Sequence, residues 1–273
     1  MNEGLGVEVG ERCKLLDCAG GGGKESEKRE KGKFGGGFCR LRVARVIEQS
    51  MIDGYRFWGG FLPLATVPSR MDVINVTADA ETFTSNAYLA LGSVPTMVDA
   101  GSMDGVEEVI REHTETVERV VLTHQHGDHI GELETIISAF DADCFAFADH
   151  PLRTAELRDG EKLVIGDETV EVVHTPGHGD DHVSLVGEHS LFSGDVVVYN
   201  DEAFDDGSFG RTDYPGMSRE QLIESIETLL DRLPETVETM YAGHGEVYTG
   251  DVRSVIERSL ERAKRREPKY PDE

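Results

Sequence analysis

Short apolar runs rich in β-branched residues alternate with amphipathic segments from residue 71 onwards. The runs have the length and composition of strands, and the segments repeat apolar residues at helical spacing. We expect strands at about 73–77, 86–91, 95–99, 118–123, 143–148, 163–165, 169–173, 183–186, 190–193 and 237–241. We expect helices near 104–112, 130–139, 150–156, 218–232 and 251–266. This alternation predicts an α/β fold.

The densest polar motif follows one of these strands. Residues 123–129 read Thr-His-Gln-His-Gly-Asp-His and lead into a predicted helix. Imidazole and carboxylate groups suit zinc and other borderline divalent ions. His124 and His126 are two positions apart and can converge on one ion. The glycine after them allows a sharp turn that directs Asp128 and His129 towards a neighbouring position, so the spacing predicts a metal site with room for two ions.

Three later polar residues also follow predicted strands. His178 lies in a Thr-Pro-Gly-His segment, Asp195 in Ser-Gly-Asp and His244 in Gly-His-Gly. A Pro-Gly turn or a flanking glycine lets the chain leave the sheet at these points. Because each residue comes at the end of a strand, we expect all three to join the first motif at one edge of a sheet.

The order of these motifs resembles that of the metallo-β-lactamase superfamily, and the resemblance extends over residues 71–273. It implies a four-layer αβ/βα sandwich, an α/β fold. It also implies seven ligands for two divalent metal ions: His124, His126 and His178 for the first, Asp128, His129 and His244 for the second, and Asp195 between them. Zinc is the expected metal, with iron or manganese as alternatives.

The resemblance implies metal-assisted hydrolysis. Two cations about 3.5–4 Å apart would hold a water, lower its pKa from about 16 towards about 7 and polarise a carbonyl. Asp128 is the predicted catalytic residue, because it would both bind metal and orient the attacking water. Aspartate at position 195, where β-lactamases tend to have cysteine, argues against antibiotic hydrolysis. Histidine at position 126 argues against the diiron flavoprotein branch, which usually has glutamate there.

A further segment narrows the branch. Residues 207–216 look like the Gly-Arg-Thr-Asp segment of glyoxalase II-like thioester hydrolases and of the related persulfide dioxygenases. Arg211 is the candidate for binding a substrate carboxylate or positioning the loop. The alternative is that Arg211 pairs with Asp213 as scaffolding. The connection at residues 198–206 is longer than usual, and we expect no helical glutathione-binding domain in residues 245–273.

Three functions remain open. The first is hydrolysis of thioesters, lactones or similar acyl compounds, with a small molecule as the binding partner. The second is a mononuclear iron persulfide dioxygenase of the same superfamily, and the third is a metal-bound interaction module without catalysis. His182 is interpreted as structural, with a hydrogen bond to a ligating histidine as the alternative. The oligomeric state is not predicted.

Residues 1–70 differ chemically from the rest of the chain. They hold 12 of the 27 Lys and Arg, 9 of the 53 Asp and Glu, and 14 of the 31 glycines, for a net charge of +3. We predict a Gly-rich, disordered leader and a native start at Met71, with residues 71–273 as the hydrolase domain. The alternative is that Cys13, Cys18 and Cys39 form a metal or redox cluster, although they contain no Cys-x-x-Cys pair.

Residues 71–273 are strongly acidic, with a net charge of −29. This charge predicts an acidic, halophilic surface adapted to a salt-accumulating cytoplasm. It argues against nucleic acid as a partner, because a protein must supply cations to displace phosphate counterions. No apolar run is long enough to span a bilayer and no secretion signal leads the chain, so we expect a cytoplasmic protein without a membrane partner.

Dialysis from molar salt into low salt should therefore unfold the protein. Salt at 1 M shortens the screening length to about 3 Å, and its removal exposes the acidic groups to one another. Circular dichroism and thermal melting at both ionic strengths measure the effect, with sucrose replacing salt as a control for general solute exclusion. Full stability at low salt would contradict the prediction.

Overall fold

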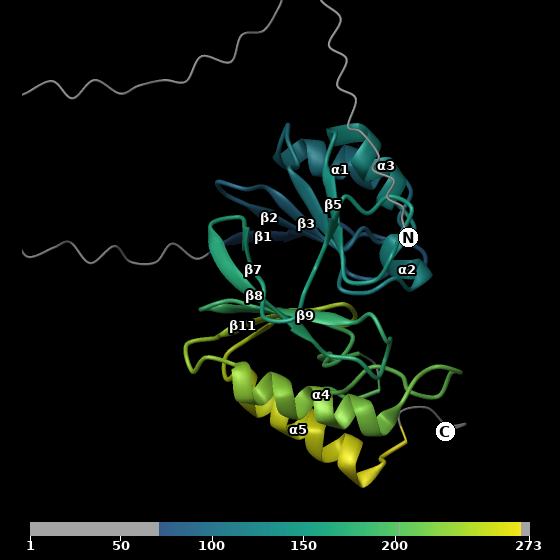
Figure 1. The fold of residues 1–273 in the computed structure, drawn as a ribbon, viewed down its shortest axis with the longest axis vertical. Helices are drawn as coiled ribbons and strands as arrows, with labels where there is room; N and C mark the ends of the chain where they lie inside the picture. The colour runs from purple at the N-terminus through teal and green to yellow at the C-terminus, as the bar shows by residue number, and fades with distance from the viewer. Residues whose placement is uncertain (1–70, 202, 269–273) are drawn as a thin grey trace, which may run out of the picture. The chain divides into compact units, whose positions relative to one another are not determined.

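The computed structural model describes residues 71–201 and 203–268. The predicted leader at residues 1–70, with its three cysteines, lies outside the described residues, and the start at Met71 stays a prediction. The described elements form two six-stranded sheets, with helices on the outer side of each sheet (Figure 1). The four-layer αβ/βα sandwich predicted from the sequence is therefore confirmed.

The first sheet follows chain order. Its strands are β1 (Asp72–Asn75), β2 (Tyr88–Leu91), β3 (Thr96–Val98), β4 (Arg119–Val121), β5 (Asp143–Ala146) and β6 (Ala155–Glu156). Strands β1 to β3 are antiparallel, whereas β3 to β6 are parallel. Helices α1 (Val106–His113) and α3 (Leu133–Phe140) bury Ile110, Leu133 and Ile136 against this sheet. The short helix α2 (Gly127–Ile130) precedes α3.

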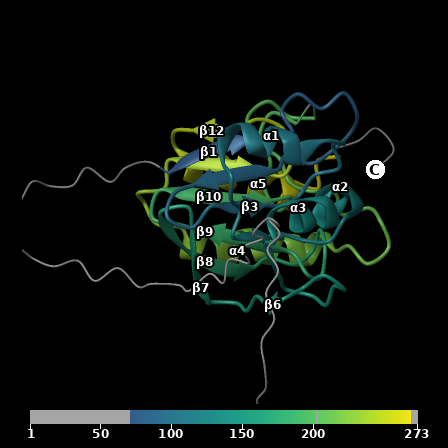
Figure 2. The ribbon, with the colours of Figure 1, turned by 90° about the horizontal axis from the view of Figure 1, so that it is seen from above.

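The second sheet has the order β12-β11-β10-β9-β8-β7, and Figure 2 shows β10, β9, β8 and β7 side by side in that order. Its strands are β7 (Lys162–Ile165), β8 (Glu168–His174), β9 (Val183–Val186), β10 (Ser190–Gly194), β11 (Thr239–Ala242) and β12 (Tyr248–Thr249). The pair β10 and β11 is parallel, and the other pairs are antiparallel.

Helices α4 (Arg219–Arg232) and α5 (Val252–Arg265) cover the second sheet. Ser218 caps the start of α4, because its hydroxyl accepts a hydrogen bond from the backbone N–H of Gln221. Arg253 of α5 donates to the carbonyls of Leu230 and Leu233 at the end of α4. The two helices are thus joined by polar contacts as well as by apolar packing. None of the described helices is long and apolar enough to cross a membrane.

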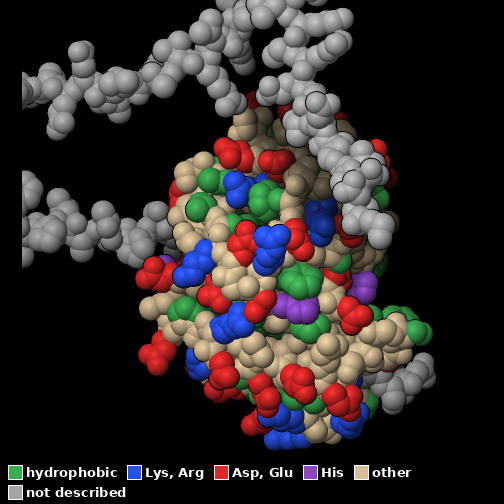
Figure 3. All heavy atoms as spheres, viewed as in Figure 1, with side chains coloured by type: hydrophobic (Ala, Val, Ile, Leu, Met, Phe, Trp, Pro, Cys, Tyr) green, Lys and Arg blue, Asp and Glu red, His purple; other side chains and the backbone are tan. Residues whose placement is uncertain are grey.

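Apolar side chains from both sheets meet in the middle of the sandwich. The ring of Phe192 lies 4.9 Å from that of Tyr241 and 6.0 Å from that of Tyr88. Tyr88 also donates its hydroxyl to the carbonyl of Ala242, so its polar end is satisfied inside the core. On the surface drawn in Figure 3, Asp and Glu side chains are spread over the face with Lys and Arg set among them.

The prediction of a helix at 150–156 is wrong. Thr154 instead donates its backbone N–H to the carbonyl of Cys144, and Leu157 donates to that of Ala146. Residues 155–156 therefore form the edge strand β6 beside β5. The free edge of the sheet offered partners for the backbone that outweighed the local helical preference of this short segment. Strand β12 and helix α2 were also not predicted, because both are very short.

Replacement of Phe192 by alanine should cost about 3–5 kcal/mol in the free energy of unfolding, because the cavity lies between two sheets that cannot collapse independently. Denaturant unfolding monitored by circular dichroism measures this cost. Phe83→Ala is the matched control, since that side chain is 79% exposed and should contribute little to stability. Equal stability of the two variants would contradict the described core.

Candidate metal centre

All seven predicted ligands lie at one edge of the sandwich. His124 and His126 follow β4, and Asp128 and His129 belong to α2. The other three follow β8, β10 and β11, and they are His178, Asp195 and His244. Three overlapping groups have ligand atoms within 4.8 Å of one another: His124, His126 and His178; His124, His129 and Asp195; and Asp128, His129 and His244.

The first group consists of three imidazoles. Nδ1 of His126 lies 3.0 Å from Nε2 of His124 and 2.9 Å from Nε2 of His178. Three ring nitrogens therefore surround one point at the mouth of the fold. A divalent cation at that point would use all three lone pairs at once.

The group of Asp128, His129 and His244 adds carboxylate oxygen. Oδ2 of Asp128 lies 3.1 Å from Nε2 of His244 and 3.8 Å from Nε2 of His129. Asp195 faces both groups, because its Oδ1 is 3.5 Å from Nε2 of His129 and its Oδ2 is 3.3 Å from Nε2 of His178 and 3.4 Å from Nε2 of His244. Asp195 thus lies between the two groups, and its role as a ligand stays a prediction.

Two buried atoms of this cluster have no hydrogen-bond partner. They are Nε2 of His129 and Oδ1 of Asp195. Buried polar atoms of folded proteins are almost always paired, so orphans at one place require an explanation. The donor set of five imidazoles and two carboxylates provides it, because these atoms are ligands for borderline divalent cations. The residues present therefore fit metal binding.

The electrostatics of the cluster also favour a cation. Burial would raise the pKa of the Asp195 carboxyl, but His244 and His129 hold it well below its usual range. Burial would lower the pKa of His129, yet the carboxylates of Asp195 and Asp99 hold it well above the usual value. Burial keeps the pKa of His124 and His178 low, which leaves their lone pairs free to bind metal. Asp195 is thus a buried anion that needs positive charge beside it.

Asp99 orients the cluster and was missed in the sequence. It is buried, accepts hydrogen bonds from the backbone and hydroxyl of Thr123 and lies 2.8 Å from Nδ1 of His129. This contact fixes the His129 ring so that Nε2 faces the other ligands. The sequence contained a signal for this residue. Asp99 lies at the end of a predicted strand and is followed by Ala-Gly, and the candidate ligands also come at the ends of predicted strands.

His182 supports Asp195 through the backbone. Its Nε2 accepts a hydrogen bond from the Asp195 N–H at 2.9 Å, and its Nδ1 lies 2.8 Å from the hydroxyl of Thr175. Burial lowers the pKa of His182 to about 3, so the ring is neutral and can accept. These contacts agree with the structural interpretation of this residue.

Arg211 makes the ion pair that was the alternative to substrate binding. Its guanidinium bonds to both carboxylate oxygens of Asp213, at 2.8 and 2.5 Å, and lies 4.4 Å over the Tyr214 ring. Its carbonyl accepts a hydrogen bond from Nδ1 of His178 at 2.9 Å. Arg211 therefore has a positioning role through its backbone, while its side chain lines the cleft described below.

Glycines let the chain approach Asp195 closely. A Cβ on Gly243 would lie 2.1 Å from Oδ1 of Asp195, and one on Gly210 would lie 2.1 Å from its carbonyl oxygen. Both distances are far below van der Waals contact. Gly243 and Gly210 are therefore required by packing around Asp195, the first against its carboxylate and the second against its backbone carbonyl.

The long connection after Asp195 forms part of the cleft wall. Val198 pairs with Ser208, and Tyr199 pairs with Gly245. Arg258 and Arg262 of α5 hold Asp206 of this connection by hydrogen bonds and ion pairs. The connection thus rests on α5 and brings residues 200 and 201 to the cleft.

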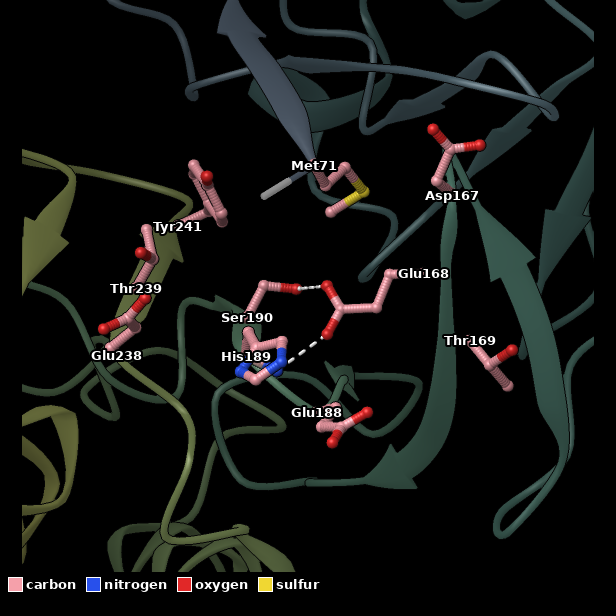
Figure 4. Close-up of a pocket in the computed structure, with 10 residues that line it drawn as sticks. All are labelled: Met71, Asp167, Glu168, Thr169, Glu188, His189, Ser190, Glu238, Thr239 and Tyr241. Atoms are coloured by element: carbon pink, nitrogen blue, oxygen red, sulfur yellow. Dashed lines mark hydrogen bonds between the residues drawn. The ribbon is translucent and has the colours of Figure 1, made fainter. Parts of the chain in front are cut away.

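The cluster lies in a cleft of about 940 Å³. A second cavity, of about 370 Å³, lies where β10 and β11 begin, whereas Asp195 and His244 follow the ends of these strands (Figure 4). In that cavity, Glu168 accepts hydrogen bonds from the Ser190 hydroxyl and the His189 backbone. It contains none of the predicted ligands.

Comparison with known proteins agrees with this geometry. The model of the metallo-beta-lactamase superfamily matches residues 80–143 and 143–244. The chain belongs to this superfamily.

The curated relatives share about 30% identity with part of this chain. A hydroxyacylglutathione hydrolase of Vibrio cholerae is 32% identical over 151 residues, which cover 54% of this chain and 56% of the relative. The beta-lactamase-like protein 2 homolog of Drosophila melanogaster is 28% identical over 186 residues, with coverages of 60% and 59%. The chain thus matches less than two thirds of the length of these relatives.

Solved structures share the fold. BLEG-1 B3 metallo-beta-lactamase superposes with a TM-score of 0.51 at 28% identity, over 65% of this chain and 91% of that chain. ETHE1 from Myxococcus xanthus superposes with a TM-score of 0.54 at 22% identity, over 69% and 89%.

Replacement of Asp99 by asparagine should lower the affinity for divalent metal about 10–100-fold, because the charge that orients His129 is lost. Competition with a chelator on metal-stripped protein measures this affinity. Asp149→Asn is the matched control, since Asp149 is an exposed partner of Arg153. Unchanged affinity in a folded Asp99→Asn variant would show that Asp99 does not act on the cluster.

Proposed function

We propose that this protein is a metal-dependent hydrolase of thioesters, lactones or similar acyl compounds. Its ligands would be His124, His126 and His178 for one ion, Asp128, His129 and His244 for a second, and Asp195 between them. Zinc is the first choice for both ions, with iron or manganese as alternatives. The position of Asp195 carries the proposal, because its two oxygens face imidazoles of both groups at 3.3–3.5 Å.

The metal pair, when bound, would supply a water of lowered pKa and polarise the scissile carbonyl. Asp128 is half-buried on the cleft wall, where its carboxylate can accept a hydrogen bond from the attacking water and hold the oxygen towards the carbonyl carbon. In a thioester, the carbon–sulfur bond breaks as the carbon–oxygen bond forms. One proton of the water leaves with the carboxylic acid, and the other is taken up by the sulfur, which is released as the thiol.

The relatives support this reaction class. Proteins of Vibrio cholerae and Vibrio vulnificus named hydroxyacylglutathione hydrolase are 32% and 34% identical to this chain over about half of its length. The match covers only 56% and 55% of these relatives, so the acyl chemistry transfers more readily than the substrate. Arg211 could meet a substrate carboxylate only in competition with Asp213.

A mononuclear iron persulfide dioxygenase is the second candidate. One observation favours it: His124, His129 and Asp195 form a group of two histidines and one carboxylate within 4.8 Å. This ligand set is typical of non-haem iron sites that leave coordination positions open for substrate and oxygen. A dioxygenase would consume oxygen, whereas hydrolysis would not.

Metal analysis of protein purified without added metal separates the candidates. The hydrolase should contain two divalent ions per chain and cleave a thioester or lactone without oxygen. One iron per chain, together with oxygen consumption on a persulfide, would establish the dioxygenase instead.

His126→Ala should lower kcat for hydrolysis by at least about 100-fold, because it removes a ligand rather than an outer contact. His113→Ala is the control, since that residue lies at the end of α1, outside the cluster. Turnover that is unchanged in His126→Ala would show that the metal cluster does not catalyse it, and would favour the interaction module without catalysis.

A further inference from the structure

Exposed apolar side chains gather around the metal cleft. Among the described residues, the large hydrophobic side chains that are exposed are Phe83 at 79%, Tyr214 at 54% and Val247 at 42%. Phe83 and Tyr214 line the cleft, and Val247 follows the lining residue Glu246. Single exposed apolar residues are common on protein surfaces, but several around one cleft mark a binding surface.

Phe83 forms an aromatic wall directly beside a predicted metal ligand. Its ring stacks on that of His244, with the centroids 5.3 Å apart and the planes inclined by 16°. Its backbone carbonyl accepts a hydrogen bond from the hydroxyl of Ser102, and the neighbouring Thr84 accepts one from the Ser102 N–H. The loop that carries Phe83 is therefore held in place while most of the ring remains accessible.

Tyr214 is a second aromatic side chain on the lining of the cleft. The guanidinium of Arg211 lies 4.4 Å over its ring and is itself bonded to Asp213. This stack supports the ring from one side and leaves it half exposed. The cleft thus has two aromatic surfaces of separate origin, one from the loop between β1 and β2 and one from the loop before α4.

The charges of the cleft disfavour anions away from the metal. Apart from the predicted metal ligands, the lining residues of types that are charged at neutral pH are Asp201, Arg211 and Glu246. The charge of Arg211 is offset by Asp213, whose pKa the guanidinium lowers through its hydrogen bond. The remaining lining charges are negative. A carboxylate-bearing group such as glutathione would therefore meet repulsion where it leaves the reaction centre.

We propose that this cleft selects acyl compounds with an uncharged apolar group, above all an aromatic one, and discriminates against anionic thiols. Phe83 and Tyr214 are the specificity-determining residues for the apolar group, and Glu246 for the charge. This inference rests on the proposed hydrolase function and adds the substrate class to it.

Two thioesters with the same acyl group test the charge preference. Phenylacetyl thioesters of N-acetylcysteamine and of glutathione differ in the thiol, which is neutral in the first and anionic in the second. At one ionic strength that keeps the protein folded, kcat/KM should be at least about tenfold higher for the neutral thioester. A glutathione thioester that is cleaved equally well or better would overturn the inference, whereas cleavage of neither by the metal-loaded protein would overturn the hydrolase function itself.

Variants test the individual side chains. Phe83→Ala should lower the ratio of kcat/KM for phenylacetyl over acetyl thioesters of N-acetylcysteamine about tenfold, mainly through KM, and Phe83→Leu should restore part of it. Glu246→Gln should raise the ratio of kcat/KM for the glutathione thioester over the neutral thioester by about threefold. Glu188→Gln, a matched change at the cavity of Figure 4, should not alter that ratio. An unchanged ratio in Phe83→Ala, or equal effects of the two glutamate variants, would refute the assignment.

Discussion

The burial of one carboxylate, that of Asp195, is the constraint on which the site depends. An anion inside a protein is costly unless positive charge or hydrogen-bond donors surround it. Here His129, His178 and His244 surround the carboxylate, and His182 holds the backbone N–H beneath it. The remaining orphan oxygen shows that protein groups alone do not complete this environment. A divalent cation here would pair with this oxygen and offset the buried charge.

The direction of the strands in the two sheets brings these groups together. The parallel pairs β3 and β4 in one sheet and β10 and β11 in the other end at the same edge of the sandwich. Asp99 follows β3, the first motif follows β4, Asp195 follows β10 and His244 follows β11. Ligands far apart in the chain therefore converge without a long loop between them. The aromatic core around Phe192 keeps the two sheets, and hence the two halves of the site, in register.

Much of this could be predicted from the sequence, for a physical reason. The ligand motifs are dense because each ligand must leave a strand within a few residues, and the helices and most strands have strong apolar periodicity. The edge strand β6 was mistaken for a helix because its stability comes from β5 rather than from its own residues. Asp99, Phe83 and Tyr214 were missed because their role depends on neighbours that lie far away in the chain: His129 for Asp99, His244 for Phe83 and the surface of the cleft for Tyr214.

The residues proposed to perform chemistry and those proposed to select substrates differ in how they are held. The ligands follow buried strands or lie in α2, and their outer contacts, through Asp99 and His182, are buried as well. The walls of the cleft come from loops, and one of them is held by Arg258 and Arg262 of α5 at the surface. A change in the ligands disturbs a buried charge and the surrounding packing, whereas a change in the walls costs little stability. The proposed substrate selection by Phe83, Tyr214 and Glu246 is therefore independent of the metal motifs.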